Sequence, residues 1–425
     1  MTSNWNVSRK VVTFAGSVSL NTSIMMKTVF AVLLAFLSMT IQGQTYSSLW
    51  KQAEEAERKD LPRTQYDVLM KIVNKAQKEG EYGQLMAAEL AGSRVMTGIA
   101  PDSLQPAVER MEARQRATSD KALATVYAVI LKKIYADNEQ LKPQGDLTVT
   151  LDEETCERLA AVKAADYKPL TVIGRNSSIF GDDMLSVVGY ELNDFRPLHN
   201  YYTKVGNRQA MLMTALQIAR QGCPQGQVKY AQASYIHTLD SLIACYSDVP
   251  EVAEVAIDRY EYMTAHTDAT ADEQWAYLND AISRWGSYNR TNELRNAQRN
   301  MVARQYNAEL ETRVAMPGQE QKLKLTDIRN IERLDYRVYR VDVRGDTRLN
   351  PEDEKDYKKL KPLIAKKDEY SGTLSCLGHK EYELFEDSLP LPALPVGVYL
   401  IEMESVPATN VSRRLYFVRR VGAHP

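Results

Sequence analysis

The spacing of apolar residues changes near Met316–Gly318, and this change constrains the fold more than any other feature of the chain. From about Tyr46 to Asn307 apolar residues recur every three or four positions, as in amphipathic helices. After Gly318 they alternate with polar residues, as in strands with one buried face. Because the chain is also too long for one typical core, the sequence predicts an α+β multidomain protein, with an irregular antiparallel helical array before an antiparallel β-sandwich.

A secretion signal precedes the helical array. Lys27 is followed by a short apolar run over 28–37 and then by the small residue Gly43, which are the three parts of a signal peptide. The run is shorter than the roughly 20 apolar residues of a membrane span. We therefore expect a signal peptide over 25–43, contact with the membrane through this peptide alone, and a soluble mature protein that is periplasmic, at the cell surface or extracellular.

Residues 1–24 form a polar stretch ahead of this signal. We expect translation to begin at Met25 or Met26, which would make 1–24 an untranslated or disordered extension. No Cys follows the cleavage region, so a lipid anchor is not expected there. The mature chain is expected to begin near Gln44.

Two helical subdomains are predicted, over 44–141 and 182–315, in the style of tetratricopeptide arrays but without a repeat of fixed period. Between them, 142–181 is predicted to be a linker or irregular segment. Asp182 and Asp183 are candidates for the cap of the helix that follows. Stripes of helical spacing lie within Thr64–Glu79, Ser119–Asp137, Tyr235–Tyr246, Val252–Met263 and Trp275–Trp285.

Residues 316–419 are predicted to form the sandwich, followed by a short aberrant tail at 420–425. The alternation changes phase between Val338 and Tyr339, which indicates either a bulge or a strand buried on both faces. The charged insert Asn350–Tyr370 is predicted to be a surface loop or short helix. Alternating apolar positions predict strands at Lys322–Thr326, Leu334–Val343, Tyr382–Leu384, Tyr399–Met403 and Val411–Phe417.

The sequence lacks the motifs of several common enzyme classes. It contains no GxxxxGK[ST] phosphate loop, no HExxH zinc helix and no GxSxG nucleophile elbow. The five histidines are scattered, and no pair of cysteines forms a CxxC motif. With a net charge of -2, the chain is not expected to bind nucleic acid. We expect no metal, no cofactor and no catalytic residues.

Cysteine and histidine nevertheless come close together at Cys376 and His379. A Cys–His catalytic pair is the functional interpretation, but catalytic partners are usually distant in sequence, so we favour a structural role. Cys223 and Cys245 flank a predicted helix over Gln227–Tyr246 that would span about 30 Å. Since a disulfide needs Cα atoms within about 7 Å, buried free thiols are expected instead.

Tyrosine is the dominant aromatic residue, with 24 copies against 7 of Phe. Its ring can pack while its hydroxyl stays hydrated, which suits interfaces and also the half-buried layers between stacked helices. We expect the second use to dominate. Carboxylates such as those of Glu54, Glu55 and Glu57 are expected to lie on hydrated helix faces.

Several blocks of the chain resemble the N-terminal region of large exported alpha-2-macroglobulin-like proteins of bacteria. The longest block is Trp285–Gln298, and Pro392–Leu400 resembles the late strands of a macroglobulin-type β-sandwich. Tyr46–Trp50 and Ser241–Ala244 fit the same pattern. The resemblance covers roughly Gln44 to Val418 and implies a protease-trapping or envelope-defence protein in which sandwich domains precede a thioester or bait segment.

The thioester of that family reads Cys-x-Glu-Gln, and this chain does not contain it. Asp137, Ala271 and Gly318 stand two places before the Glu of the three Glu-Gln pairs. We therefore expect a non-enzymatic front segment of a longer, truncated protein that would meet proteases or envelope proteins through downstream domains. The alternative is a free-standing extracytoplasmic helical scaffold for protein–protein binding, and a hydrolase with an unrecognised site is disfavoured.

Overall fold

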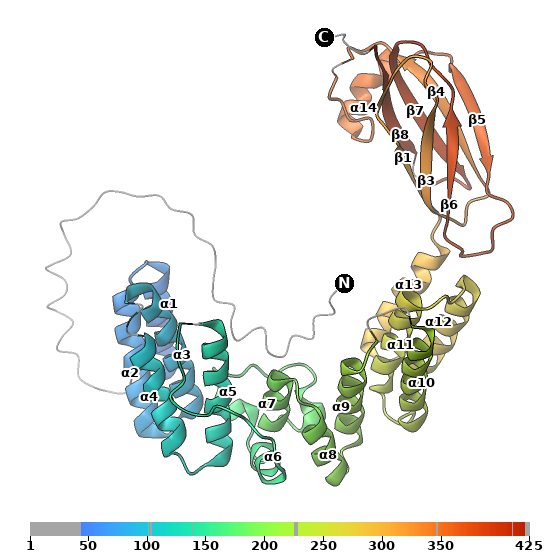
Figure 1. Ribbon diagram of the computed structural model, residues 1–425. Helices are drawn as coiled ribbons and strands as arrows, with labels where there is room; N and C mark the ends of the chain where they lie inside the picture. Colours follow the sequence, from blue (N-terminus) through green and yellow to red (C-terminus); the bar gives the residue numbers. More distant parts are fainter. Residues whose placement is uncertain are drawn as a thin grey trace, which may run out of the picture. The chain divides into compact units, whose positions relative to one another are not determined.

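The computed structural model describes residues 44–420, apart from 101, 103, 139, 225–227, 346 and 410. The predicted signal peptide, the extension before it and residues 421–425 of the predicted tail lie outside the described residues. The chain divides into two compact units, one ending at Cys223 and one beginning at Pro224. Helices come first and sheets last (Figure 1), so the prediction of a mixed α+β protein is confirmed.

The named secondary-structure elements in the described part of unit 1 are all helices. Each helix packs against the next one along the chain, which the short connections between them favour. The helices are α1 (Tyr46–Arg58), α2 (Pro62–Glu79), α3 (Tyr82–Ile99), α4 (Leu104–Ala117), α5 (Lys121–Asp137), α6 (Glu153–Ala160), α7 (Met184–Leu192), α8 (Arg196–Lys204) and α9 (Arg208–Gln221), with 3₁₀ turns η3 (Ala164–Tyr167) and η4 (Ser177–Phe180).

Capping side chains mark several of these helix ends as the sequence predicts. Asp120 accepts a 3.1 Å hydrogen bond from the Leu123 amide at the start of α5, and Asp183 accepts one of 2.8 Å from the Ser186 amide at the start of α7. Gly80 ends α2 with a φ of 73°, a left-handed conformation that glycine adopts without steric cost.

The segment 142–181 departs from the prediction of a linker or irregular segment. It contains α6, η3 and η4, and its apolar side chains belong to the same core as α5 and α7. Residues 147–151 form no strand. Because this segment contributes side chains to the hydrophobic core and does not act as a spacer, the helical half is not divided here. The boundary between compact units falls later, between α9 and α10.

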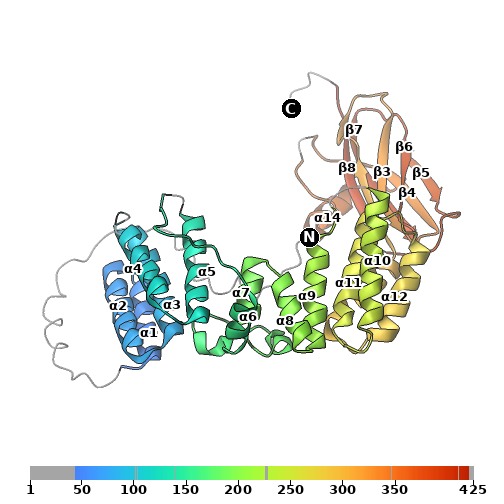
Figure 2. The same cartoon turned by 60° about the horizontal axis from the view of Figure 1, so that its bottom comes forward.

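Unit 2 begins with a second group of helices that pack side by side in chain order (Figure 2). A capping box starts α12, since Thr270 and Glu273 exchange side-chain and backbone hydrogen bonds. The helices are α10 (Lys229–Cys245), α11 (Val252–His266), α12 (Ala271–Trp285) and α13 (Asn292–Val302), with the 3₁₀ turn η5 (Asn289–Thr291) before α13.

The described strands of unit 2 form two sheets that enclose one core, with strand orders β1-β3-β6 and β2-β8-β7-β4-β5. All neighbours are antiparallel except the short parallel pair β2–β8. The strands are β1 (Gln305–Leu310), β2 (Val314–Ala315), β3 (Gln321–Arg329), β4 (Arg333–Val341), β5 (Tyr370–Ser375), β6 (Phe385–Leu391), β7 (Gly397–Val406) and β8 (Ser412–Val418).

Strand β4 packs apolar side chains on both faces near its end, although Arg333, Arg337 and Arg340 are exposed. It pairs with β7 in unbroken register, so the phase change between Val338 and Tyr339 is not a bulge. Val338 points into the core between the sheets, whereas Val341 packs with Leu360 of α14 (Glu354–Leu360) on the opposite face. The charged insert thus forms a short helix, as predicted, and it also covers the outer face of the sheet.

Two predictions about the sheets are wrong. The sandwich begins at Gln305 rather than at 316, because β1 pairs with β3. The tripeptide Tyr382–Leu384 is a turn and not a strand, since Tyr382 has a φ of 64° and the next strand begins at Phe385. Both errors arise where only a few apolar residues carry the alternating pattern.

The sandwich caps the end of α13. The side-chain amide of Asn330 donates hydrogen bonds to the carbonyls of Met301 (2.7 Å) and Ala303 (3.2 Å), and its oxygen accepts one of 3.1 Å from the Tyr382 amide. The Tyr382 ring stacks on Trp275 of α12 with centroids 4.4 Å apart. Since these contacts satisfy carbonyls that a helix end leaves without partners, α12, α13 and the sheets are joined within unit 2.

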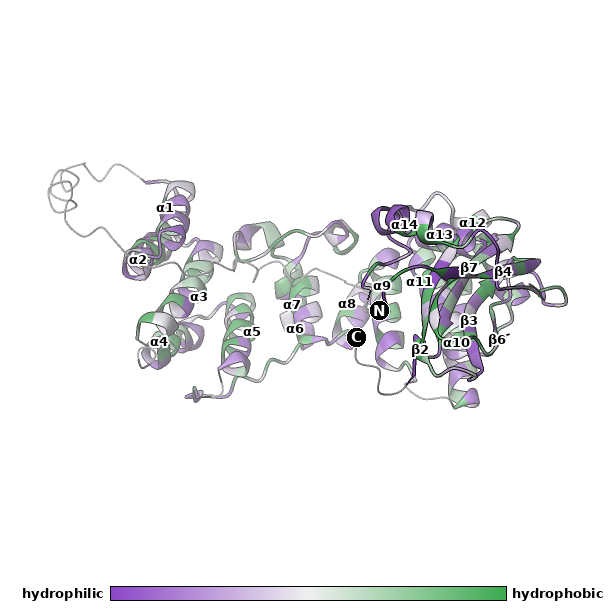
Figure 3. Cartoon of the chain, turned by 90° about the horizontal axis from the view of Figure 1, so that it is seen from above, coloured by the Kyte–Doolittle hydropathy of each residue, from purple (hydrophilic) through white to green (hydrophobic). Residues whose placement is uncertain are grey.

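Hydropathy is distributed unevenly among the helices. In Figure 3 α7 is mostly green and α14 mostly purple, which reflects the buried MLSVVGYEL and the charged EKDYKKL sequences. Within the part of the chain that the structure describes, no helix combines the length and the apolar character that crossing a membrane requires.

Candidate functional site

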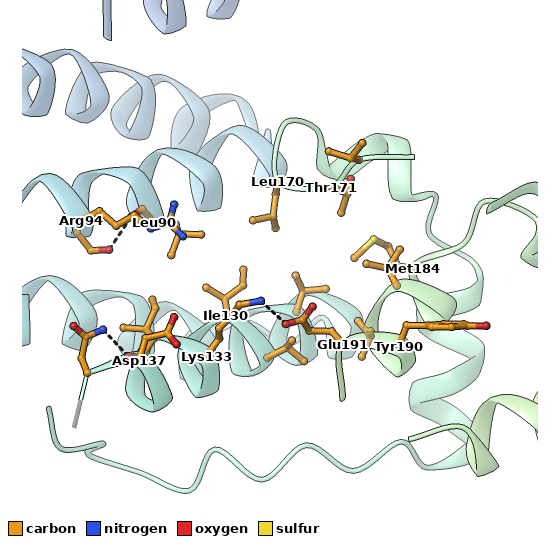
Figure 4. Close-up of a pocket in the computed structure, with 18 of the residues that line it drawn as sticks. Leu90, Arg94, Ile130, Lys133, Asp137, Leu170, Thr171, Met184, Tyr190 and Glu191 are labelled. Atoms are coloured by element: carbon orange, nitrogen blue, oxygen red, sulfur yellow. Dashed lines mark hydrogen bonds and ion pairs between the residues drawn. The ribbon is translucent and has the colours of Figure 1, made fainter. Parts of the chain in front are cut away.

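A cavity of about 390 Å³ lies in unit 1 between α3, α5, α7 and the segment that follows η3. Its lining is mostly apolar, and the charged side chains among it are those of Arg94, Lys133, Asp137 and Glu191 (Figure 4). The apolar lining includes Leu90, Leu104, Val126, Val129, Ile130, Ile134, Leu170, Val172, Met184, Val187 and Val188. An apolar pocket with a few polar groups is the usual form of a binding site.

The wall formed by 168–173 is held in place by α3. Gly83 permits the close approach, since a Cβ at this position would lie 2.3 Å from the Tyr167 carbonyl carbon. Gln84 donates a 3.2 Å hydrogen bond to the carbonyl of Lys168, and the Thr171 hydroxyl donates to the carbonyl of Ala164. These contacts fix the segment against the helices, so the cavity is formed before any ligand arrives.

The mouth of the cavity carries an exposed apolar pair. Val172 is 46% exposed and Ile173 is 38% exposed, although both are large β-branched residues. Exposed apolar side chains that adjoin a pocket are typical of interaction sites rather than of an ordinary surface. Val172 also lines the cavity itself, whereas its neighbour Ile173 is not among the lining residues.

Charged side chains at the rim come from three helices. Lys133 of α5 and Glu191 of α7 form an ion pair of 2.6 Å that spans the cavity wall (Figure 4). Arg94 of α3 and Asp137 of α5 line the same rim and are exposed. The rim thus carries two positive and two negative groups. It suits a ligand that has an apolar body surrounded by polar groups with no net charge.

The serine and threonine hydroxyls that line the cavity are bound to backbone carbonyls. Ser93 donates to Leu90 (2.8 Å) and Thr97 donates to Ser93 (3.0 Å). Among the described lining residues there is no His and no Cys. An activated nucleophile needs a base within hydrogen-bond reach, and none of these hydroxyls is placed on one. The geometry therefore supports binding by the cavity.

Cys376 and His379 are not arranged as a catalytic pair. Cys376 lies in the core of the sandwich, where burial raises the pKa of its thiol and disfavours the nucleophilic thiolate. The His379 ring stacks on Phe385, with centroids 3.4 Å apart, and its Nδ1 lies 3.7 Å from a Glu383 oxygen. Each side chain thus has a packing role of its own.

The other cysteines follow the sequence prediction only in part. Cys156 is buried, as expected, and burial raises the pKa of its thiol to about 11. Cys223 is half-buried and Cys245 is exposed, so the expectation that these two thiols are buried is wrong. Across the described residues no group of His, Cys, Asp and Glu is arranged to hold a metal ion.

Tyrosine hydroxyls bind buried carboxylates between helices, a feature that sequence reasoning missed. Glu54, Glu55 and Glu57 lie on an exposed face, as predicted. Other carboxylates are buried in the helical layers, and each receives a hydrogen bond from a tyrosine of a different element. The pairs are Tyr135–Glu112 (2.8 Å), Tyr202–Asp183 (2.9 and 3.1 Å) and Tyr288–Glu254 (2.8 Å). These tyrosines therefore pack between helices and also satisfy buried charge.

Comparison of the chain with protein-family models and with curated proteins finds no match.

Proposed function

We propose that this chain is a non-enzymatic, exported scaffold that binds another protein, and that the cavity of unit 1 receives an apolar anchor of the partner. The observation that carries this proposal is the exposed Val172 side chain, which is itself part of the apolar cavity lining. Protein interfaces concentrate their binding energy where an apolar side chain fills a desolvated pocket.

The chemistry of the lining supports binding over turnover. The lining hydroxyls of Ser93, Thr97 and Thr171 are each bound to a backbone carbonyl. The Lys133–Glu191 pair and the Arg94 and Asp137 side chains would form the polar rim around a partner's anchor, as at other protein interfaces.

A photo-cross-linking experiment tests this function. Benzoylphenylalanine replaces Val172 in the full chain, which is produced in its native cell, and Val205 is replaced in the same way as an exposed apolar control in the same unit. We expect a discrete cross-linked protein from position 172 and none from position 205. Equal products from both positions, or none from position 172, would contradict the proposal.

Variants that fill part of the cavity test whether the cross-link at position 172 depends on it. Thr97→Trp places an indole at the rim, whereas Thr125→Trp makes the same change on α5 outside the cavity lining. The two threonines are matched, because each donates a hydrogen bond to the carbonyl four residues earlier. We expect Thr97→Trp to abolish the cross-link at Val172 and Thr125→Trp to leave it unchanged.

A second candidate function rests on the blocks that resemble alpha-2-macroglobulin-like proteins. In this candidate the helices form an array in tetratricopeptide style, the two sheets are a macroglobulin-type sandwich, and the chain is a front segment that supports protease trapping by other domains. The block Pro392–Leu400 runs into β7, a central strand, which is compatible with it. An antibody against 44–418 tests it: a native product several times larger than roughly 43 kDa favours the trap, and one of that mass opposes it.

A further inference from the structure

The sandwich of unit 2 contains a cleft of about 690 Å³ at the end of β4. Among the described residues, its charged lining consists of Arg340, Arg344 and Arg419 with the carboxylate of Asp342. The whole chain has a net charge of -2, so this excess of positive charge is local. Apolar side chains, such as that of Val396, form the walls between the arginines.

The backbone around the cleft is fixed by hydrogen bonds. After α14, the turn η6 (Lys361–Leu363) leads into a segment that is held against the end of β4. The Asp342 amide donates to the Leu363 carbonyl (2.9 Å), and the Ala365 amide donates to the Arg340 carbonyl (2.8 Å). The two walls of the cleft are therefore held together without a ligand.

Arg340 and Arg419 are held by hydrogen bonds to backbone carbonyls and keep N–H donors that these bonds do not use. One N–H of Arg340 donates to the Val396 carbonyl (3.4 Å), and one N–H of Arg419 donates to the Gly345 carbonyl. The Arg419 guanidinium also lies over the Phe417 ring, 5.2 Å from its centroid. A guanidinium has five N–H donors, so each of these two groups can hold its position and still bind an anion.

We propose that this cleft binds a phosphate-bearing ligand through Arg340 and Arg419. The planar fork of arginine matches the oxygens of phosphate in bidentate geometry, and two such groups favour an anion with more than one negative charge. The apolar walls accommodate an uncharged part of the ligand. This inference does not depend on the protein partner proposed for unit 1.

Free phosphates and phospholipid headgroups share this chemistry, and two assays distinguish them. Calorimetric titration of the full mature chain with inorganic pyrophosphate measures binding of a free phosphate. Co-sedimentation with phosphatidylcholine vesicles, with or without phosphatidylglycerol, measures binding of a headgroup. Binding in either assay is expected to weaken as sodium chloride is added, because exposed charge pairs are screened.

Variants localise the binding to the cleft. Arg340→Gln and Arg419→Gln should each weaken it about tenfold, since each removes a charge-assisted hydrogen bond. Arg348→Gln is the matched control, because Arg348 is exposed in the same loop region but does not line the cleft. Asp342→Asn should tighten binding about threefold by removing the opposing charge, a gain that misfolding cannot produce.

The outcomes decide the proposal. Pyrophosphate binding with no difference between the two vesicle types assigns a soluble phosphate, and selective sedimentation with phosphatidylglycerol assigns a headgroup. The absence of binding in both assays would overturn the inference. So would a loss with Arg348→Gln as large as that with Arg340→Gln, because binding would then be general charge attraction.

Discussion

The hydroxyl of Tyr288 donates a 2.8 Å hydrogen bond to the carboxylate of Glu254, which is completely buried in α11. Burial raises the pKa of Tyr288, so its hydroxyl remains protonated and able to donate. Arg290 forms an ion pair with the other oxygen of Glu254. The turn that leads into α13 thus supplies two partners of a buried charge and is held against α11.

Removing Arg290 should destabilise unit 2 much more than removing the tyrosine hydroxyl. Arg290→Met removes one cation from the buried Glu254 carboxylate, which costs about 3–5 kcal/mol. Tyr288→Phe removes one hydrogen bond to a charged group, or about 2 kcal/mol. Hydrogen exchange of α11 peptides measures both as changes in the free energy of opening.

The double variant Glu254→Gln, Arg290→Met is the control for this prediction. It removes the buried charge together with its partner, so it should be more stable than Arg290→Met alone. If the double variant is no more stable, the cost of Arg290→Met comes from lost packing and not from an unpaired charge.

The stability of unit 1 should depend on pH through Asp183, the cap of α7. Burial raises the pKa of this carboxyl, against the opposing effect of hydrogen bonds from Ser186 and Tyr202. Above the ordinary aspartate pKa, Asp183 has lost its proton in the unfolded chain but retains it in the folded chain. Its contribution to the free energy of unfolding therefore falls as pH rises, until the folded carboxyl also ionises. Asp183→Asn removes this contribution and should gain stability relative to wild type across that window.

Asp152 provides a control of opposite sign. It caps α6 in the same way, but hydrogen bonds from Thr155 lower the pKa of its carboxyl. Its contribution is present above the ordinary aspartate pKa and is lost as pH falls through the lowered one. Urea unfolding of unit 1 at a series of pH values should therefore show Asp152→Asn losing stability relative to wild type as pH rises. The same trend in both variants would contradict the assignment.

The sequence predicts most elements of this fold because their stripes are long. The helix over Ser119–Asp137 and the strand at Tyr399–Met403 each combine a repeated apolar pattern with a cap or a turn. Short elements were missed: β1 and β2 depend on pairing with residues distant in the chain, which local pattern does not report. The sequence predicts a linker or irregular segment over 142–181 because its apolar residues have no regular spacing. They nevertheless lie in the core of unit 1.

The cavity and the buried carboxylates could not be predicted for a different reason. Arg94, Lys133 and Glu191 are ordinary charged residues on three helices, and only the packing of those helices brings them to one rim. Glu254 lies within the apolar run Val252–Ile257, but this run alone does not show which side chains would satisfy its carboxylate. The sequence does contain the adjacent β-branched residues Val172 and Ile173 in an irregular segment. Such a pair could have indicated an apolar contact there.

The thiols of Cys156 and Cys376 should react slowly in the folded protein. Burial raises the pKa of each, to about 11 for Cys156, so little thiolate is present near neutral pH and reagents lack access. Maleimide labelling followed by mass spectrometry should be slower than in urea by at least about a hundredfold. Rapid labelling of Cys376 without urea would show that it is accessible and would reopen the catalytic interpretation.

The joint between α13 and the sheets should depend on Asn330 in two separable ways. Its side chain bonds Met301, Ala303 and Tyr382, and its backbone has a φ of 55°. Asn330→Gly keeps the backbone conformation accessible and loses only the side-chain bonds, at about 2 kcal/mol. Asn330→Ala loses the same bonds and adds the left-handed strain of a Cβ, so it should be about 1 kcal/mol less stable than the glycine variant. Hydrogen exchange in α13 measures the difference, and equal exchange in the two variants would show that the backbone relaxes and that the side-chain bonds alone hold the joint.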